Sequence, residues 1–248
     1  MLSKNINYKD FKFKTKNKKI KKYFTDILNE NNEIVKSLTP NFKYQYSKNL
    51  IKRFKKEKIL KIIGMGGSVL GAHAIHDFLK HKVKKKVFFF DNIDSNFKTK
   101  EKGLNLIISK SGNTLETIVN SNVVIKKNEK NIFITESQSS YLRSLALELK
   151  AEIINHNNFI GGRYSVMSEV GMLPTELMDL NSSNFKQLNN LIKNKNFVNS
   201  LISNVSSTLF FIKKKKFNSI ILNYDDSATN LFNWYQQLIA ESLGKKGK

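Results

Sequence analysis

Six residues with mostly small polar side chains interrupt an apolar run and are suited to binding an anion. Residues 109–114 read Ser-Lys-Ser-Gly-Asn-Thr and stand between the largely apolar residues 104–108 and a segment with helical spacing. Ser111, Asn113 and Thr114 are favoured at helix N-termini, so the pattern predicts a strand, a tight turn and a helix. The free N–H groups and the positive dipole end of such a helix favour phosphate. An ordinary capped helix without a ligand is the alternative interpretation.

A second strand, turn and helix pattern lies upstream. Residues 59–63 form a strand-like run that ends in Gly-Met-Gly-Gly-Ser at residues 64–68. Glycines let the backbone approach a ligand closely, and Ser68 stands where the next helix starts. A dinucleotide fingerprint needs a third glycine where this chain has Val69, although Asp91 ends the next strand at a suitable distance. A nucleotide cofactor therefore stays an alternative, and two phosphate-type turns for one small ligand fit better.

Two further segments carry groups that could act on a ligand. Arg163, one of only three arginines in the chain, follows two glycines in Gly-Gly-Arg-Tyr-Ser at residues 161–165. A guanidinium at such a turn can stabilise developing negative charge, or it can simply donate to loop carbonyls. Gln237 and Glu241 stand one turn apart on one face of a predicted helix. Seen alone, Glu241 would be interpreted as a surface residue paired with Lys245.

Short apolar runs alternate with helical patterns through the middle of the chain. This alternation is typical of an α/β protein, with a parallel sheet covered on both faces and ligands at the carboxyl ends of the strands. Amphipathic helices are expected in residues 1–50, with a break at Pro40, and again in residues 183–213 and 228–243. The lysine-rich tract at residues 12–19 is expected to form an exposed face. The predicted strands are residues 59–63, 85–90, 104–108, 131–135, 151–155 and 217–222.

The overall composition narrows the classes of function. With 43 Lys and Arg against 20 Asp and Glu, the 248-residue chain has a net charge of +23. Such a charge attracts nucleic acid, but nearly all of it is lysine spread along the chain, and sequence readers rely on arginine, so nucleic acid is not expected as the main partner. The lack of cysteine excludes disulfides, thiolate nucleophiles and cysteine metal ligands. No apolar run suits a membrane span or a signal peptide, so a cytoplasmic protein is predicted.

Four motifs taken together resemble the phosphoglucose isomerase family. They are residues 64–68, 109–117, 161–165 and 237–245, in the family's order, and the resemblance runs from about residue 59 to residue 248. The second motif alone is shared by many sugar-isomerase (SIS) domains, which bind phosphosugars. The resemblance implies a doubly wound parallel sheet of the SIS type and the conversion of glucose 6-phosphate to fructose 6-phosphate in glycolysis and gluconeogenesis, without metal or organic cofactor. It also implies a homodimer with two SIS domains in each chain.

The resemblance further implies a role for each matching residue. Ser109, Ser111 and Thr114 would bind the phosphate, with Lys110 beside them. Ser68 and Gln237 would bind the sugar. Arg163 and Glu241 would act at the reacting carbons. Arg163 would stabilise the enediolate intermediate, and Glu241 would move a proton between C1 and C2. General chemistry agrees, since aldose–ketose exchange needs a base, a fixed cation for the enediolate oxygen and binding energy from the remote phosphate. Glu241 can be that base if it is partly buried.

The chain also departs from the family pattern. The complete enzyme uses a His and a Lys from its C-terminal half for ring opening and proton handling. Neither is matched here, and the four histidines are expected to be packing or helix-surface residues: His73, His76, His81 and His156. We therefore expect an N-terminal, incomplete portion of the enzyme, divided into a helical segment (residues 1–50), a first SIS domain (51–182), and linking helices with the start of a second SIS domain (183–248). Two alternatives stay open, namely a non-enzymatic SIS module that senses a sugar phosphate and an isomerase of another phosphosugar, such as mannose or an amino sugar.

Overall fold

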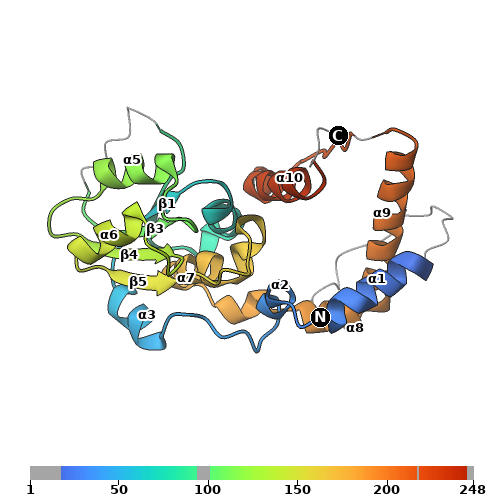
Figure 1. Cartoon of the computed structure of the whole chain (residues 1–248), viewed down its shortest axis with the longest axis horizontal. Helices are drawn as coiled ribbons and strands as arrows, with labels where there is room; N and C mark the ends of the chain where they lie inside the picture. The colour runs from blue at the N-terminus through green and yellow to red at the C-terminus, as the bar shows by residue number, and fades with distance from the viewer. Residues whose placement is uncertain (1–17, 94–100, 217, 245–248) are drawn as a thin grey trace. The chain divides into compact units, whose positions relative to one another are not determined.

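The computed structural model describes residues 18–93, 101–216 and 218–244. Contacts within the chain divide it into two compact units, and Figure 1 labels most of their helices and strands. The helical unit comprises Met1–Phe42 and Ser183–Leu222, and the sheet unit comprises Lys43–Ser182 and Asn223–Lys248. All of the predicted site residues belong to the sheet unit. The three-segment division expected from the sequence stays a prediction.

Five parallel strands in the order β2-β1-β3-β4-β5 form the centre of the sheet unit. Strands of such a sheet are nearly continuous apolar runs because both faces are covered, and every residue of β3 is buried. The fold class is therefore α/β, as predicted, and five of the six predicted strands are confirmed. The strands are β1 (Ile59–Gly64), β2 (Lys86–Phe90), β3 (Leu104–Ile108), β4 (Lys130–Thr135) and β5 (Glu152–Asn155).

The order of the strands changes direction between β1 and β3. From β1 the chain crosses to β2 on one side and later returns to β3 on the other side. The carboxyl ends of β1 and β3 meet at the paired residues Gly64 and Ile108. In doubly wound sheets, ligands bind at such a topological switch point. The two predicted anion-binding turns, which directly follow these residues, therefore flank it.

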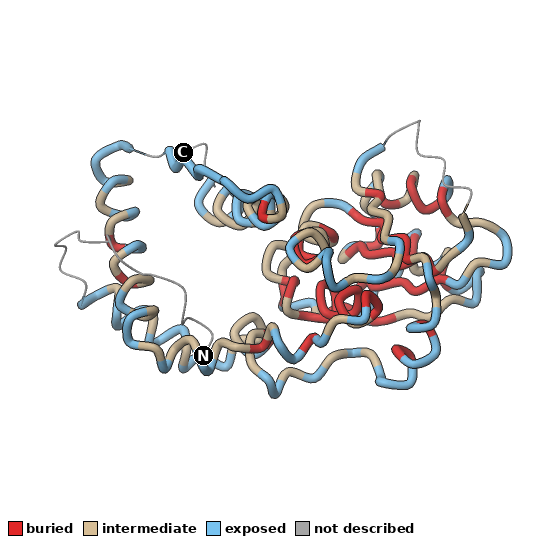
Figure 2. The backbone as a smooth tube through the Cα atoms, turned by 180° about the vertical axis from the view of Figure 1, so that it is seen from behind, coloured by how far each residue is buried: buried red, intermediate tan, exposed pale blue. Residues whose placement is uncertain are grey.

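Helices cover the sheet and complete its core. One face carries a buried cluster that includes Ile63, Ile107 and Phe133, closed by Val124 of α5 (Leu115–Val124) and Leu142 of α6 (Tyr141–Glu148). Figure 2 shows the buried residues gathered in the strands and the adjoining helices. Beside the sheet, α10 (Thr229–Leu243) packs against α4 (Leu70–Phe78) and two short turns, η1 (Gly66–Ser68) and η3 (Gly162–Met167). The other elements of this unit are α3 (Lys48–Phe54), η2 (Lys80–Lys82), α7 (Glu169–Leu177) and η5 (Asp226–Ala228).

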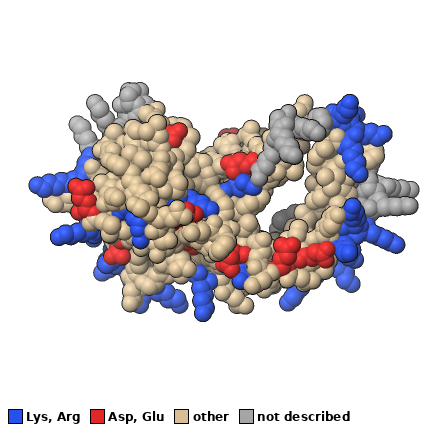
Figure 3. Space-filling model, in the orientation of Figure 1, with Lys and Arg blue, Asp and Glu red and all other residues tan. Residues whose placement is uncertain are grey.

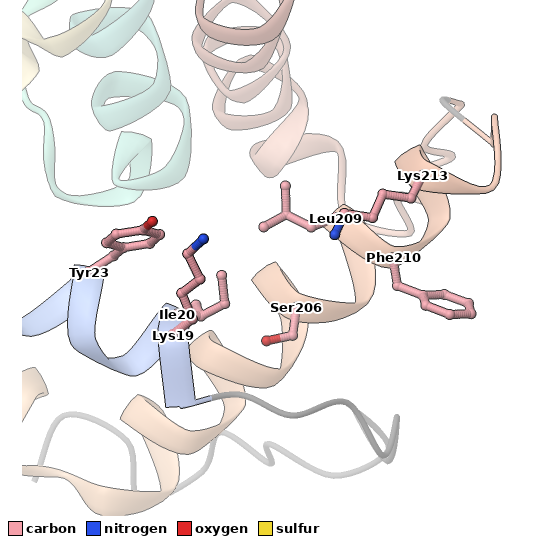
Figure 4. A pocket seen from close by; sticks show the side chains of 7 residues that line it. All are labelled: Lys19, Ile20, Tyr23, Ser206, Leu209, Phe210 and Lys213. Atoms are coloured by element: carbon pink, nitrogen blue, oxygen red, sulfur yellow. The ribbon is translucent and has the colours of Figure 1, made fainter.

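The helical unit confirms the amphipathic helices predicted near the N-terminus and after residue 182. Its helices are α1 (Lys18–Asn29), α2 (Glu33–Ser37), α8 (Leu188–Lys193) and α9 (Lys195–Lys213), and the turn η4 (Ser182–Phe185) precedes α8. Between α1 and α9 lies a mostly apolar pocket lined by Ile20, Tyr23, Leu209 and Phe210, with Lys19 and Lys213 beside them (Figure 4). This pocket contains none of the predicted site residues.

The sixth predicted strand, at residues 217–222, is wrong. Residues 218–222 pair with no strand in the described part of the chain, and residue 217 lies outside it. A strand needs a neighbour to bind its N–H and C=O groups, and the side chain pattern alone does not supply one. Without that neighbour, Ile220 is 85% exposed and Leu222 73% exposed. The helix expected after it is present, and α10 packs on the existing sheet unit.

Positive charge is spread over the molecule. In the face that Figure 3 shows, Lys and Arg side chains appear on the sheet unit as well as on the helical unit. Of the exposed tract predicted at residues 12–19, only Lys18 and Lys19 lie within the described residues, and both are exposed. Among the helices that the structure describes, we find none that combines the length and the apolar character of a membrane span.

Candidate active site

The turn that follows β3 is closed by its own side chains. The hydroxyl groups of Ser109 and Thr114 share a hydrogen bond of 3.0 Å, and Ser109 Oγ also accepts from the N–H of Gly112 at 3.2 Å. Ser111 Oγ accepts from the N–H of Asn113 at 3.2 Å. Gly112 has a φ of 67°, a left-handed conformation that glycine adopts without strain. The result is a compact turn in which Ser109 is buried and Ser111 is exposed.

The start of α6 holds this turn in place. The N–H of Tyr141 donates to Asn113 Oδ1 at 2.9 Å, and the N–H of Leu142 donates to the Gly112 carbonyl at 3.0 Å. A Cβ atom added at Gly112 would lie 2.1 Å from Ser140 Oγ, so no larger residue fits there. The shape of the turn is thus set by protein contacts before any ligand binds.

The N-terminus of α5 is directed to the same turn. Thr114 is the N-cap residue, but its side chain makes no capping hydrogen bond, because its hydroxyl is bonded to Ser109. Within the described residues, the N–H groups of the first helical turn therefore have no side-chain cap. Such groups, at the positive end of a helix dipole, can bind the oxygen atoms of a phosphate.

Lys110 points away from the hydroxyl groups of the turn. Its Nζ donates to the carbonyl oxygens of Asn158 at 2.9 Å and Ile160 at 3.3 Å, both in the loop that follows β5. It also lies 3.4 Å from the Glu136 carboxylate. Lys110 therefore ties the turn after β3 to the loop after β5, a contact that the sequence did not predict.

The glycine-rich turn after β1 contacts two other predicted motifs. Ser68 ends the short helix η1, and Gly66 has a left-handed φ of 54°. A Cβ atom added at Gly66 would lie 3.0 Å from Gln237 Nε2, and one added at Gly67 would lie 2.4 Å from the carbonyl carbon of Gly162. Only glycines allow α10 and the Gly-Gly-Arg turn to approach so closely.

Arg163 and Glu241, the two predicted catalytic residues, are in contact. Arg163 Nη1 donates to Glu241 Oε2 at 3.3 Å, and Arg163 Nε donates to Ser242 Oγ at 3.0 Å. The Arg163 carbonyl accepts from Trp234 Nε1 at 3.1 Å. Gln237 Nε2 donates to the other carboxylate oxygen, Glu241 Oε1, at 2.7 Å. The carboxylate is therefore held between a guanidinium and an amide.

The surroundings of this pair favour a fixed cation beside the carboxylate. The pKa of Arg163 is raised above its ordinary value, first by a hydrogen bond with Tyr164 and further by the Glu241 carboxylate. The Tyr164 ring lies 4.6 Å from the guanidinium carbon, and its hydroxyl shares a hydrogen bond of 3.0 Å with Ser242 Oγ. The Glu241 side chain is 46% exposed, so the described residues do not provide the burial that its expected role as base requires.

The predicted site residues thus form two groups at one edge of the sheet. The groups are joined through the ends of β1 and β3, where a Cβ atom added at Gly64 would lie 2.8 Å from the Ile108 carbonyl oxygen. The group after β3 contains Ser109, Lys110, Ser111 and Thr114, and the group around η1 and α10 contains Ser68, Arg163, Gln237 and Glu241.

Comparison with known proteins identifies the family. The family model described as phosphoglucose isomerase matches residues 15–248. The chain belongs to the phosphoglucose isomerase family. It is 34% identical over 209 residues to the glucose-6-phosphate isomerase of Methanocaldococcus jannaschii. The aligned region covers 74% of this chain and 50% of the relative. It is also 32% identical over 250 residues to the probable glucose-6-phosphate isomerase of Methanococcus maripaludis. This aligned region covers 90% of this chain and 54% of the relative.

A solved structure supports the fold of this family member. A hypothetical protein of Thermus thermophilus superimposes with a TM-score of 0.69 and 19% identity, over 92% of this chain and 60% of that chain. At this level of identity the likeness shows the fold alone. The chain spans about half the length of the curated phosphoglucose isomerase relatives it matches.

Two residues of α10 that hold Arg163 were not predicted as site residues in this family member. Ser242 binds both the Arg163 guanidinium and the Tyr164 hydroxyl, and Trp234 binds the Arg163 carbonyl. The spacing of Trp234 with Gln237 and Glu241 could have indicated Trp234, because residues three and four apart share a helical face. Ser242 directly follows Glu241 and has no such signal. Among the described residues we find no group of three or more His, Asp or Glu side chains arranged to hold a metal ion.

Proposed function

We propose that this protein catalyses the reversible conversion of glucose 6-phosphate to fructose 6-phosphate through an enediolate, a reaction used in glycolysis and gluconeogenesis. The observation that carries the proposal is the contact of Arg163 Nη1 with the Glu241 carboxylate at 3.3 Å, beside the glycine turn after β1. A base and a fixed cation side by side are the two groups that this reaction needs. Membership of the phosphoglucose isomerase family supports the same conclusion.

The proton transfer assigns a separate task to each of these groups. Glu241 removes the proton from C2 of the open-chain aldose, and the C–H electron pair becomes the C1–C2 double bond of the enediolate. The carbonyl oxygen at C1 then carries negative charge, which the Arg163 guanidinium stabilises. Transfer of the O2 hydroxyl proton to O1, together with return of the carbon-bound proton from Glu241 to C1, leaves the carbonyl at C2 and gives the ketose. Gln237, which donates to Glu241 Oε1 at 2.7 Å, orients the carboxylate for both transfers.

The phosphate group supplies binding energy at a distance from the reacting carbons. The turn after β3 offers the exposed hydroxyl of Ser111 and the open N-terminus of α5. Phosphate held there would position the sugar chain across the switch point toward Glu241. Binding energy from such a remote group lowers the barrier by fixing the reacting atoms.

The remaining parts of the function are proposals on the same basis. We infer a cytoplasmic homodimer with a sugar phosphate as its substrate, in line with the resemblance. Ring opening needs an acid and a base that act on O5 and O1 of the cyclic sugar, and no residue of the two groups at the switch point has that task. We infer that other residues of the protein supply it.

One experiment tests the proposal against a sensor that binds without reacting. Glucose 6-phosphate and fructose 6-phosphate would be compared with mannose 6-phosphate and glucosamine 6-phosphate by calorimetry. Exchange of the C2 proton of a four-carbon aldose 4-phosphate, which cannot close a ring, would be followed by NMR in D₂O. A bound ligand raises the melting temperature by mass action, which gives a second readout. Tight binding of the first two sugars with C2 exchange supports the isomerase, whereas binding without exchange under any condition would favour the sensor.

A further inference from the structure

A buried histidine and glutamate meet beneath the loop that carries Arg163. The side chains of His156 and Glu169 are 1% and 0% exposed. His156 Nδ1 lies 3.0 Å from Glu169 Oε1, and His156 Nε2 lies 3.0 Å from the carbonyl oxygen of Ile160. His156 directly follows β5, and Glu169 is the first residue of α7. The pair therefore links the two ends of the segment between β5 and α7.

The partners of the ring fix the number of protons in this pair. A carbonyl oxygen can only accept, so His156 Nε2 carries a proton. A second proton must lie between His156 Nδ1 and Glu169 Oε1, because two bare acceptors at 3.0 Å would repel. Glu169 Oε1 also accepts from the N–H of Asn157 at 3.0 Å. The pair as a whole is thus neutral, and each member also binds a backbone group of the loop, the Ile160 carbonyl for His156 and the Asn157 N–H for Glu169.

The position of Glu169 indicates that it does more than fill space. Its second oxygen, Oε2, is buried without a hydrogen-bond partner among the described residues, and its neighbours in α7 include the fully buried Met172 and Leu173. An apolar residue would pack there at no such cost, since a buried carboxylate is expensive unless it is well paired.

Lys110 binds the same loop. The Ile160 carbonyl accepts both from His156 Nε2 at 3.0 Å and from Lys110 Nζ at 3.3 Å. Lys110 Nζ also reaches the carbonyl of Asn158 at 2.9 Å. Two glycines follow Ile160, and Arg163 comes next. The conformation of this loop therefore sets the start of η3 and the direction in which Lys110 leaves the phosphate turn.

We propose that His156 and Glu169 are positioning residues that share a proton and hold the loop between β5 and η3, so that Arg163 and Lys110 are in place for a sugar phosphate. The part that concerns the ligand rests on the proposed function. The part that concerns the loop does not, and it can be tested without any substrate.

The first test uses the chain without ligand. Histidine labelled with ¹⁵N should show two protected ring N–H signals for His156, which are lost in H156N and kept in H81N, since His81 is exposed. In E169Q the bridging N–H signal should be lost, and the amides of residues 157–160 should exchange faster. E176Q is the matched control, because Glu176 lies on the same helix and contacts Tyr46 and Ser182 instead of the loop. Unchanged ring signals and unchanged exchange in E169Q would overturn the proposal.

The second test separates positioning from mere packing. E169Q should weaken fructose 6-phosphate binding by about tenfold, since a guanidinium and an ammonium are no longer pre-organised, while E176Q should bind as the wild type does. The apolar double variant H156L/E169L should regain the melting temperature, because the buried ion pair is replaced as a unit, but not the affinity. Recovery of both the melting temperature and the affinity in the double variant would show that His156 and Glu169 only fill space in the core. If the wild-type chain binds no phosphosugar, the proposed function fails, and the first test still decides the role of the pair in the loop.

Discussion

At the scale of single residues, the contact of Arg163 with Glu241 combines two motifs that stand far apart in the sequence. The guanidinium reaches Ser242 Oγ and Glu241 Oε2 from η3, and Gln237 donates to the same carboxylate from α10. A planar, permanently charged group can bind a carboxylate now and an enediolate oxygen later without changing its protonation. This arrangement gives each residue a distinct expected effect when it is replaced.

Replacing the base should stop proton transfer and leave binding intact. E241Q keeps the size of the side chain and can still contact Gln237 and Arg163, but it removes the basic carboxylate. We expect C2 exchange to fall by several orders of magnitude, in keeping with the loss of a positioned base. Calorimetry should show unchanged fructose 6-phosphate affinity, and E148Q, on the exposed surface of α6, serves as the control. Full C2 exchange in E241Q would remove Glu241 from this role.

Replacing the arginine should affect turnover more than affinity. R163K keeps one positive charge but cannot bind Glu241 and Ser242 at the same time, because lysine lacks the planar fork of donors. Loss of the guanidinium weakens binding of the enediolate oxygen more than binding of the ground-state carbonyl. The rate of C2 exchange of an open-chain aldose phosphate at saturation should therefore fall, while its affinity changes little. R53K is the matched control, since Arg53 pairs with Glu152 away from the site. Wild-type turnover in R163K would mean that Arg163 only supports the loop.

At the scale of the elements, the turn after β3 is shaped by the protein and open at the N-terminus of α5. The double variant S111A/T114A should weaken sugar phosphate binding by about 2 to 4 kcal/mol, the sum of two charge-assisted hydrogen bonds. S144A, on the exposed side of α6, should have no effect. Calorimetry measures the affinity, and the melting temperature checks that the turn still folds. An unchanged affinity would contradict the assignment of the turn to phosphate.

The opposite ends of the same strands carry a buried polar row. Lys61, Asn105 and Asn131 are paired in register across β1, β3 and β4. Lys61 Nζ donates to Glu129 at 2.7 Å, and both side chains are fully buried. Burial alone would raise the pKa of Glu129, but hydrogen bonds from Asn105 and Lys61 outweigh it and lower the pKa below its ordinary value. The row thus stabilises the sheet only while Glu129 is charged.

This buried polar row predicts how the stability of the protein depends on pH. Because the pKa of Glu129 is lower in the folded state, its contribution is complete above the unfolded-state pKa and is lost as the pH falls through the folded-state value. Denaturant unfolding at pH 7 and at about pH 4 should show a loss of stability that is smaller in E129Q than in the wild type. E30Q, on a residue exposed after α1, is the control. An equal loss in E129Q and the wild type would contradict this reading of the row.

The elements also show what the sequence could and could not predict. Five strands were predicted to within one residue because central parallel strands are continuous apolar runs. The run at residues 217–222 has the same local pattern, but a strand exists only with a neighbour, which no local pattern reveals. The residue types of the site were recognised from their motifs. The contacts of Lys110 and the pairing of His156 with Glu169 were not predicted, because each depends on how the segment between β5 and α7 folds.

At the scale of the whole molecule, the described site holds a base and a cation but no histidine. His73 and His76 contact Asp77 on α4, His156 is bound to Glu169, and His81 lies on η2. Under the proposed function, the described groups would move a proton on an open-chain sugar, and none of them is assigned a task in ring opening.

This difference gives the last prediction. The 248-residue chain should bind glucose 6-phosphate and fructose 6-phosphate yet show negligible conversion of these cyclic sugars. A four-carbon aldose 4-phosphate cannot close a ring, so it bypasses ring opening, and its C2 proton should exchange measurably in D₂O. That exchange should vanish in E241Q and persist in the E148Q control, because only the first loses the base. Robust conversion of glucose 6-phosphate by the same chain would mean that ring opening is carried out by residues within it, and the search would then begin with His73, whose ring lies beside α10 through its contact with Asn230.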